Sequence, residues 1–258
     1  MVKGFDKFKQ YFAPHSDSFV VIGGTAMQLH GREGGGPVPR VTQDIDILVI
    51  VEQMSESFTS AFHSFLREGR YDCYIAKEPD GSNKPRFYRF INPKNTAFPT
   101  RIELLSSPAL PPPEGMLYMS LPDEPDDSMS AIVLDRTYYD FARANTVAIN
   151  EIPCLNRDAL MVFKSVAYLN LMDEYERTGN RLRHHDSKKH RRDVLALTAS
   201  VPPGEVATVP NEIAERLRAF VSSIEANRGE WQSVLDSLGD PTGNMEDYIL
   251  AFRRHFAL

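Results

Sequence analysis

Two stretches near the N-terminus decide the fold of this chain: residues 19–25 read FVVIGGT, and residues 40–51 read RVTQDIDILVIV. The first is a short β-branched run that stops at two glycines, which is the pattern of a buried strand ending in a tight turn. We expect a short helix over residues 25–30 and a second buried strand over residues 47–51. Between them, residues 31–39 are so rich in Gly and Pro that they predict a mobile loop.

Two acidic residues stand at the entry of the second strand. In an extended chain, residues i and i+2 point to the same face, so the carboxylates of Asp44 and Asp46 face one way while Ile45 faces the core. Two hard anions on one face suit Mg²⁺, which takes one or two carboxylates plus substrate phosphates. Glu103, in a predicted strand at 100–105, offers a third carboxylate. The plainer alternative is that these acids solvate strand ends, although acidic residues are depleted in strands.

The turn after the first strand has the parts of a phosphate cradle. Gly23 and Gly24 permit close backbone approach, the following helix offers free N–H groups, and Thr25 adds a hydroxyl. A Gly-Gly turn between a strand and a helix is common, so this feature gains weight only beside the paired carboxylates.

The remaining pattern places strands early and helices late. Six prolines between residues 107 and 127 exclude regular structure there and predict a long connector. The order of elements predicts an α+β fold, with a mixed β-sheet and flanking helices over residues 1–155 and a C-terminal helical bundle over residues 156–258. The elements expected from their periodicity are a helix at 55–68, strands at 86–91, 100–105, 132–134 and 146–155, and helices at 158–178, 191–199, 210–227, 231–238 and 244–256.

The composition is that of an ordinary folded protein, with 42% hydrophobic and 25% charged residues among 258. The two cysteines, Cys73 and Cys154, have neither zinc-site nor disulfide spacing, which favours a reducing compartment. The net charge of −6 excludes a strongly basic module, so any contact with nucleic acid must use a local patch. No apolar run approaches the roughly 18 residues of a membrane span, and the N-terminus lacks a secretory signal. We therefore expect a cytoplasmic protein without membrane contact.

The run VIGGTAMQLHG, followed by RVTQDIDILV, resembles the nucleotidyltransferases of the polymerase-β-like superfamily. The closest likeness is to the AbiEii/AbiGii toxin-type branch. That family has Gly-Gly/Ser with a small hydroxyl residue, a short helix, and then Arg-x-Thr-x-Asp-x-Asp. Downstream, a helix bearing Lys and a later Lys-Asp-x-x-Asp helix are similar to Lys164 and to residues 189–193, KHRRD, where His190 replaces the first Asp of the motif.

The resemblance implies a function and a set of residue roles. Residues 1–155 would be a nucleotidyltransferase catalytic domain in which Asp44, Asp46 and Glu103 are catalytic and ligate Mg²⁺ or Mn²⁺, with an NTP as substrate. Nucleotide binding is carried over to Gly23, Gly24, Thr25, Arg40, Thr42, Lys164, Lys189 and Asp193. Such an enzyme would transfer an NMP to an acceptor hydroxyl and release pyrophosphate.

A basic stretch offers a site for a polyanionic acceptor. Residues 177–192 are expected as a polar loop leading into the helix at 191–199. Up to residue 193 this stretch carries seven Lys and Arg against two Asp, a local charge of +5 in a protein of net charge −6. A solvated surface is the commoner explanation of such a run. The resemblance instead suggests RNA, tRNA in particular, as the acceptor.

Two alternatives to an RNA-modifying toxin stay open at this point. The same chemistry can serve a small-molecule acceptor of the aminoglycoside type. A protein of another class, a catalytically inactive nucleotide-binding module with a regulatory role, could also keep the fold, although three carboxylates beside phosphates would repel them without a metal. The toxin interpretation further implies a cognate antitoxin protein as a partner.

Overall fold

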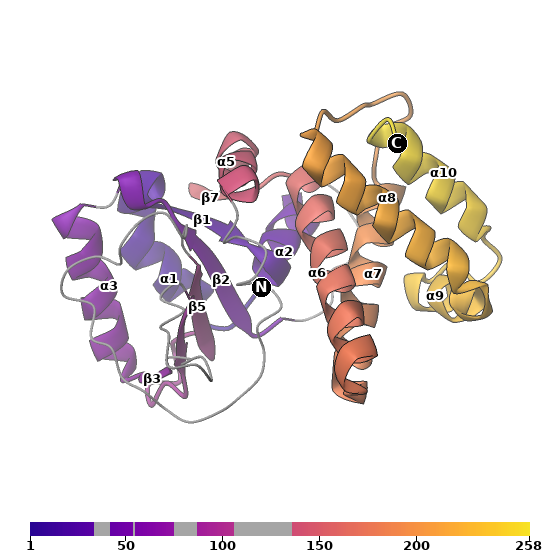
Figure 1. Ribbon diagram of the computed structural model, residues 1–258. Coiled ribbons are helices and arrows are strands. Elements are labelled where there is room, and N and C mark those ends of the chain that lie inside the picture. Colours follow the sequence, from indigo (N-terminus) through magenta and orange to yellow (C-terminus); the bar gives the residue numbers. More distant parts are fainter. Residues whose placement is uncertain (34–41, 54, 75–86, 106–135) are drawn as a thin grey trace. The chain divides into compact units, whose positions relative to one another are not determined.

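The computed structural model describes residues 1–33, 42–53, 55–74, 87–105 and 136–258 (Figure 1). These residues divide into two compact units, one reaching up to Asn156 and the other starting at Arg157. Four predictions lie outside the described residues: most of the loop at 31–39, the nucleotide-binding position Arg40, the proline-rich connector, and the strand at 132–134.

The first unit contains a mixed sheet of seven described strands in the order β3-β4-β5-β2-β1-β7-β6. The central strands β1 and β2 are antiparallel, whereas β2 runs parallel to β5 and β1 runs parallel to β7. Their bounds are β1 Phe19–Ile22, β2 Asp44–Val49, β3 Asp72–Tyr74, β4 Phe87–Ile91, β5 Arg101–Leu105, β6 Thr146–Ile149 and β7 Ile152–Leu155.

Six helical segments belong to the same unit. They are α1 Phe5–Phe12, α2 Gly23–Glu33, α3 Glu56–Gly69 and α5 Arg136–Ala144, with the short 3-10 helices η1 Ala13–Ser18 and η2 Val51–Gln53 beside them. Figure 1 shows α1 and α3 beside the sheet, and the two helices contact each other. Side chains of α1 and α3 form an aromatic cluster with the sheet: Phe12 packs on Phe19 of β1, and Phe62 packs on Phe90 of β4. One face of the sheet therefore packs against α1 and α3 and forms part of the hydrophobic core.

Several of these elements were not expected from the sequence. Helix α1 places Phe5, Phe8 and Phe12 at helical spacing on its buried side, which is a pattern typical of an amphipathic helix. The segment predicted as one strand at 146–155 is a hairpin, because Asn150 and Glu151 both have positive φ (51° and 66°) and turn the chain between β6 and β7. Helix α5 and the short strand β3 were also missed.

In the second unit, every regular element of the described residues is a helix. Its elements are α6 Arg157–Thr178, α7 Arg181–Ala199, α8 Asn211–Ala226, η3 Arg228–Glu230, α9 Trp231–Leu238 and α10 Met245–His255. Elements α6, α8, α9 and α10 follow the predicted helices within a few residues. The described part of the chain contains no helix long and apolar enough to cross a membrane.

Helix α7 corrects the prediction of a loop before residue 191. It starts at Arg181, and the side chain of Asn180 caps it by accepting a hydrogen bond from the Leu182 backbone N–H at 3.0 Å. Its buried side carries Arg183 and Arg191, eight residues apart. The first half of the helix buries Arg183 and Ser187 and has no hydrophobic periodicity, which is why the sequence pattern revealed only the second half, at 191–199.

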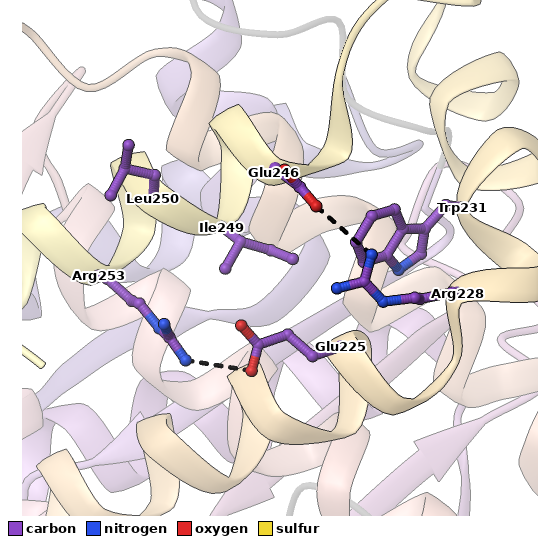
Figure 2. A pocket seen from close by; sticks show the side chains of 7 residues that line it. All are labelled: Glu225, Arg228, Trp231, Glu246, Ile249, Leu250 and Arg253. Carbon is purple, nitrogen blue, oxygen red and sulfur yellow. Dashed lines mark hydrogen bonds and ion pairs between the residues drawn. The ribbon is translucent and has the colours of Figure 1, made fainter.

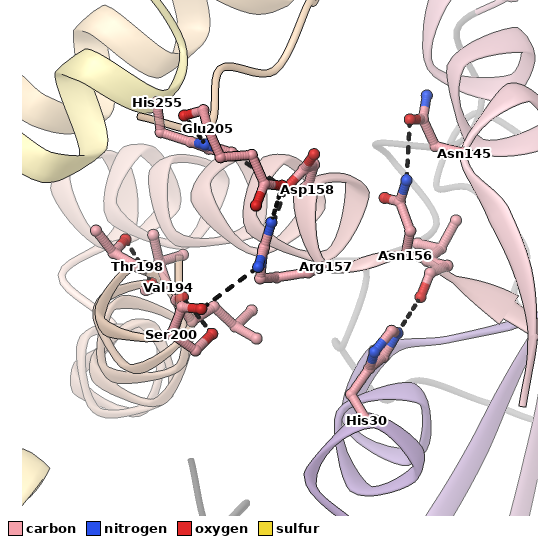
Figure 3. A network of polar contacts seen from close by, with 12 residues as sticks. His30, Asn145, Asn156, Arg157, Asp158, Val194, Thr198, Ser200, Glu205 and His255 are labelled. Atoms are coloured by element: carbon pink, nitrogen blue, oxygen red, sulfur yellow. Dashed lines mark hydrogen bonds and ion pairs between the residues drawn. The ribbon is translucent and has the colours of Figure 1, made fainter. Parts of the chain in front are cut away.

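A buried histidine ties the two ends of the helical unit together (Figure 3). His255, at the end of α10 and 1% exposed, lies 3.0 Å from the carbonyl oxygen of Glu205 through Nδ1 and 2.9 Å from Asp158 Oδ1 through Nε2. Both oxygens are acceptors, so both ring nitrogens donate, and this requires the imidazolium form.

The pKa values of this pair follow from the same contacts. Burial lowers the pKa of His255, but the hydrogen bonds to Asp158 and to the Glu205 carbonyl, with the charge of Asp158, outweigh burial and raise the pKa above its usual value. Burial raises the pKa of Asp158, and the hydrogen bond and charge of His255, with the charge of Arg157, more than offset it and leave that pKa below its usual value.

Candidate active site

The paired carboxylates lie within strand β2, not ahead of it. Strand β2 begins at Asp44, and the register across the sheet sets Ile22 of β1 opposite Asp46 and Asp46 opposite Glu103 of β5. Residues opposite one another on neighbouring strands share a face. The sheet thus brings Asp46 and Glu103 together, next to the point where β1 passes into α2.

Gly23 makes the close approach between α2 and β2 possible. It has a φ of +64°, which an L residue with a side chain rarely adopts, and a Cβ at this position would overlap Asp46 Oδ2. A Cβ at Gly24 would lie 3.0 Å from Cβ and Oγ1 of Thr42, which is tighter than ordinary contact. The two glycines therefore bring the first turn of α2 against the acidic end of β2.

Thr25 has a different role from the predicted one. Its side chain is fully buried, and its hydroxyl donates a hydrogen bond to the backbone carbonyl oxygen of Asp44 at 2.6 Å. The hydroxyl proton that was expected to contact phosphate is thus used within the protein. Thr25 fixes α2 to the start of β2, and so helps to hold Asp44 in place.

Glu103 is in contact with two arginines. Arg89 of β4, directly opposite in register, donates from Nε to Glu103 Oε1 at 2.7 Å, and Arg101 donates from Nη1 to the same oxygen at 3.3 Å. Arg89 is 5% exposed and Glu103 8%. Arg101 Nε also lies 3.7 Å from Asp44 Oδ1.

The residues of this site fit a divalent cation held by two carboxylates. Asp44 and Asp46 are both part-exposed on one face of β2, and Asp46 Oδ2 occupies the space that a side chain at Gly23 would fill. Within the described residues, no group of three His, Cys, Asp or Glu side chains is arranged to hold a metal ion. A pair of carboxylates completed by substrate phosphates is the arrangement that Mg²⁺ commonly takes.

Three predicted nucleotide-binding residues belong to the helical unit. Lys164 of α6 is 2% exposed, and its Nζ donates to Oδ2 of Asp193 on α7 at 2.7 Å. Lys164 and Asp193 therefore form a buried ion pair between α6 and α7, and the Lys164 ammonium does not extend into solvent. Lys189 is more exposed and pairs with Asp186 at 2.5 Å on its own helix.

Comparison with known proteins shows which family this chain belongs to. The model of a family described as nucleotidyl transferase AbiEii toxin, type IV toxin–antitoxin system, matches residues 9–238. The chain belongs to the AbiEii family. No curated protein and no solved structure matches the chain significantly. The match confirms the resemblance drawn from the two N-terminal motifs, and it extends over strands and helices of both units.

The basic stretch of this AbiEii chain is largely neutralised by its neighbours. Glu230, in η3, pairs with Arg191 at 2.6 Å and with Lys188 at 3.2 Å, and Arg183 pairs with Glu174 at 2.9 Å. Burial raises the pKa of Glu230, but the hydrogen bonds and charges of its two cationic partners prevail and leave it below its usual value. Within the described chain, Arg177 and Arg181 are exposed cations of this stretch that form no ion pair.

The helical unit of the AbiEii chain also carries a pocket of about 260 Å³ between α8, η3 and α10 (Figure 2). Its walls are two ion pairs, Arg228 with Glu246 at 3.4 Å and Arg253 with Glu225 at 3.1 Å. The Arg228 guanidinium lies 4.6 Å from the Trp231 ring centroid. Balanced charges over an apolar floor offer neither the paired carboxylates of a metal site nor an excess of cations for phosphate.

The sequence prediction missed Arg89. It is the charged residue in a strand that reads FYRFI, and a lone Arg in an apolar strand is a signal for a buried partner. Which partner it has depends on the register between β4 and β5, and that register is not visible in the local pattern.

Proposed function

We propose that this AbiEii-family chain is a metal-dependent nucleotidyltransferase that moves an NMP from an NTP to a hydroxyl of an RNA acceptor, with tRNA as the expected class. The observation that carries the proposal is the position of Asp44 and Asp46: they share one face of β2, and the Asp46 carboxylate lies directly against Gly23 at the start of α2. The family, which consists of nucleotidyltransferase toxins of type IV toxin–antitoxin systems, supplies the reaction class and implies a cognate antitoxin.

The proposed step is an in-line displacement at the α-phosphorus. A bond forms from the acceptor oxygen to that phosphorus while its bond to the bridging oxygen of the β-phosphate breaks, and pyrophosphate leaves. A bound Mg²⁺ or Mn²⁺ supplies the positive charge that aligns the α-phosphate. Asp44 and Asp46 hold that charge in place. The proton of the acceptor hydroxyl passes to a carboxylate on this face of the sheet, Asp46 or Glu103, which stand opposite each other.

The other predicted residues have proposed roles in binding the nucleotide or the RNA. Gly23 and Gly24 present the first turn of α2 to the nucleotide phosphates in this proposal, while Lys164, Lys189 and Asp193 keep their predicted role in nucleotide binding. Arg177 and Arg181 are the cations that we propose for RNA contact, because they are exposed and form no ion pair in the described chain.

The test is transfer of label from each α-³²P NTP in the presence of Mg²⁺ and total RNA. The wild-type chain is compared with the D44N/D46N variant and with D72N, which removes a carboxylate from strand β3 of the same sheet. We expect label in RNA with the wild type and D72N, and a loss of at least about a hundredfold with D44N/D46N.

The destination of the label decides between the alternatives. Label in RNA that falls with R177Q/R181Q supports the proposed acceptor and its contact. Label in a small molecule would establish the transferase and overturn the RNA acceptor. Absence of label from every fraction, with tight NTP binding, would leave a nucleotide-binding module and overturn the proposed reaction.

A further inference from the structure

Charged side chains of both signs cross the face of the sheet that carries the carboxylates. Arg89 of β4 stands opposite Glu103 of β5, and Glu103 stands opposite Asp46 of β2. One step along the strands, Arg101 stands opposite Asp44. Two cations and three carboxylates thus share one surface, with a net charge of −1 before any ligand binds.

The ion pair between Arg89 and Glu103 is buried, and it fixes Glu103. Both side chains are nearly inaccessible and they meet at 2.7 Å. Drawing Glu103 away from Arg89 would leave a buried guanidinium without its carboxylate, which is a costly arrangement in a protein interior. Glu103 is therefore poorly placed to leave this pair for a metal ion.

Arg101 is the more exposed of the two arginines on this face. It lies 3.3 Å from Glu103 and 3.7 Å from Asp44, and its side chain is 35% exposed. Its contact with Glu103 is the shorter of the two, and Glu103 is itself held by Arg89. Glu103 thereby keeps the guanidinium of Arg101 next to Asp44, a carboxylate that would bind the metal ion.

We infer that Arg101 is a positioning residue that occupies Asp44 in the absence of substrate, and that Glu103 acts by holding Arg101 instead of serving as a third metal ligand. The inference rests on the proposed function, because it concerns the same metal site. Like charges repel, so Arg101 weakens the binding of a free divalent cation. When the cation arrives with a triphosphate, the negative charge of the triphosphate attracts both the cation and Arg101. Metal binding is thereby coupled to nucleotide binding.

The first experiment measures Mn²⁺ alone, titrated into the full chain without nucleotide and followed by electron paramagnetic resonance. R101Q is compared with R143Q, which removes a guanidinium of similar exposure, 36%, from an ion pair with Glu52 in the same unit. We expect R101Q to bind Mn²⁺ roughly three- to tenfold more tightly than the wild type. R143Q should stay within about twofold, since a distant exposed charge is screened by salt. Unchanged or weaker binding by R101Q overturns the inference.

A second comparison separates the two roles of Glu103. The variant R89Q/E103Q removes both charges of the buried pair together, so neither is left without its partner. If Glu103 only holds Arg101, this variant frees Arg101 to pair with Asp44 and weakens Mn²⁺ binding, and the triple variant R89Q/R101Q/E103Q restores it to at least the wild-type level. If Glu103 ligates the metal, the triple variant stays weak, and the inference fails. Thermal melting of each variant confirms that it is folded.

D44N/D46N distinguishes failure of this inference from failure of the proposed function. Loss of Mn²⁺ binding in D44N/D46N, with no tightening in R101Q, would keep the metal site and reject the role of Arg101. Absence of Mn²⁺ binding by the wild type, both alone and with NTP, would reject both proposals together.

Discussion

Replacing Lys164 with methionine tests whether its ion pair with Asp193 holds helices α6 and α7 together. The two charged groups meet at 2.7 Å, and their side chains are 2% and 1% exposed. Methionine keeps most of the volume of the lysine stem and removes the ammonium. The carboxylate of Asp193 then loses its shortest ionic contact while it stays buried, and Arg192 Nη1 lies 3.9 Å from its other oxygen.

The expected loss of unfolding free energy is about 3–5 kcal/mol, the usual cost of removing one partner of a buried pair. For a helical unit of this size, such a loss lowers the melting temperature by at least about 12 °C. The double variant K164M/D193L replaces both charges with apolar groups, so we expect it to regain most of the lost stability. R253M, which breaks an exposed ion pair with Glu225, is the matched control and should cost at most about 1 kcal/mol.

Urea unfolding followed by circular dichroism measures these differences. A change of less than about 1 kcal/mol for K164M would refute the burial argument, because an ammonium that can be removed at that cost is not balancing a buried carboxylate. The double variant then reports on function: a stable K164M/D193L chain that still labels its acceptor at the wild-type rate would exclude the predicted role of the pair in nucleotide binding.

Three further predictions concern single positions. G23A should lose about 1–2 kcal/mol of stability from its positive φ, and labelling should fall as well, because the new methyl group displaces Asp46; retained labelling would contradict the close approach. S55A should cost about 1 kcal/mol in a urea titration, because the Ser55 hydroxyl caps α3; an unchanged midpoint would exclude the cap. His255 has a raised pKa, so its contribution to stability is complete below its unfolded pKa of about 6.5 and is lost as the pH rises through the folded value. Melting temperatures measured from pH 6 to 9 should therefore show a fall that H255Q lacks, and parallel curves for the two chains would disprove the imidazolium assignment.

Much of the fold was predictable because its elements are defined by neighbours in the sequence. Strand β1 and helices α3, α6, α8, α9 and α10 all follow from periodicity and turn residues, and the predicted strands 86–91 and 100–105 correspond to β4 and β5. The second strand starts earlier than expected, at Asp44, because the alternation of acid and isoleucine is itself a strand pattern. Only the second half of helix α7, predicted at 191–199, could be found in this way, since the buried positions of the first half include Arg183, which pairs with Glu174 of α6.

The candidate site likewise has some features that the sequence predicts and others that only the tertiary structure decides. The sequence alone determined that Asp44 and Asp46 share a face and that two glycines precede a helix, because both features depend on residues next to one another. Only the tertiary structure decided that Thr25 donates a hydrogen bond to the backbone of β2 and that Lys164 is buried against Asp193. It also decided that Glu103 accepts hydrogen bonds from Arg89 and Arg101. The physical reason is that the environment of a charged group is set by strand register and helix packing. These bring together residues far apart in the chain, and a local pattern holds no information about them.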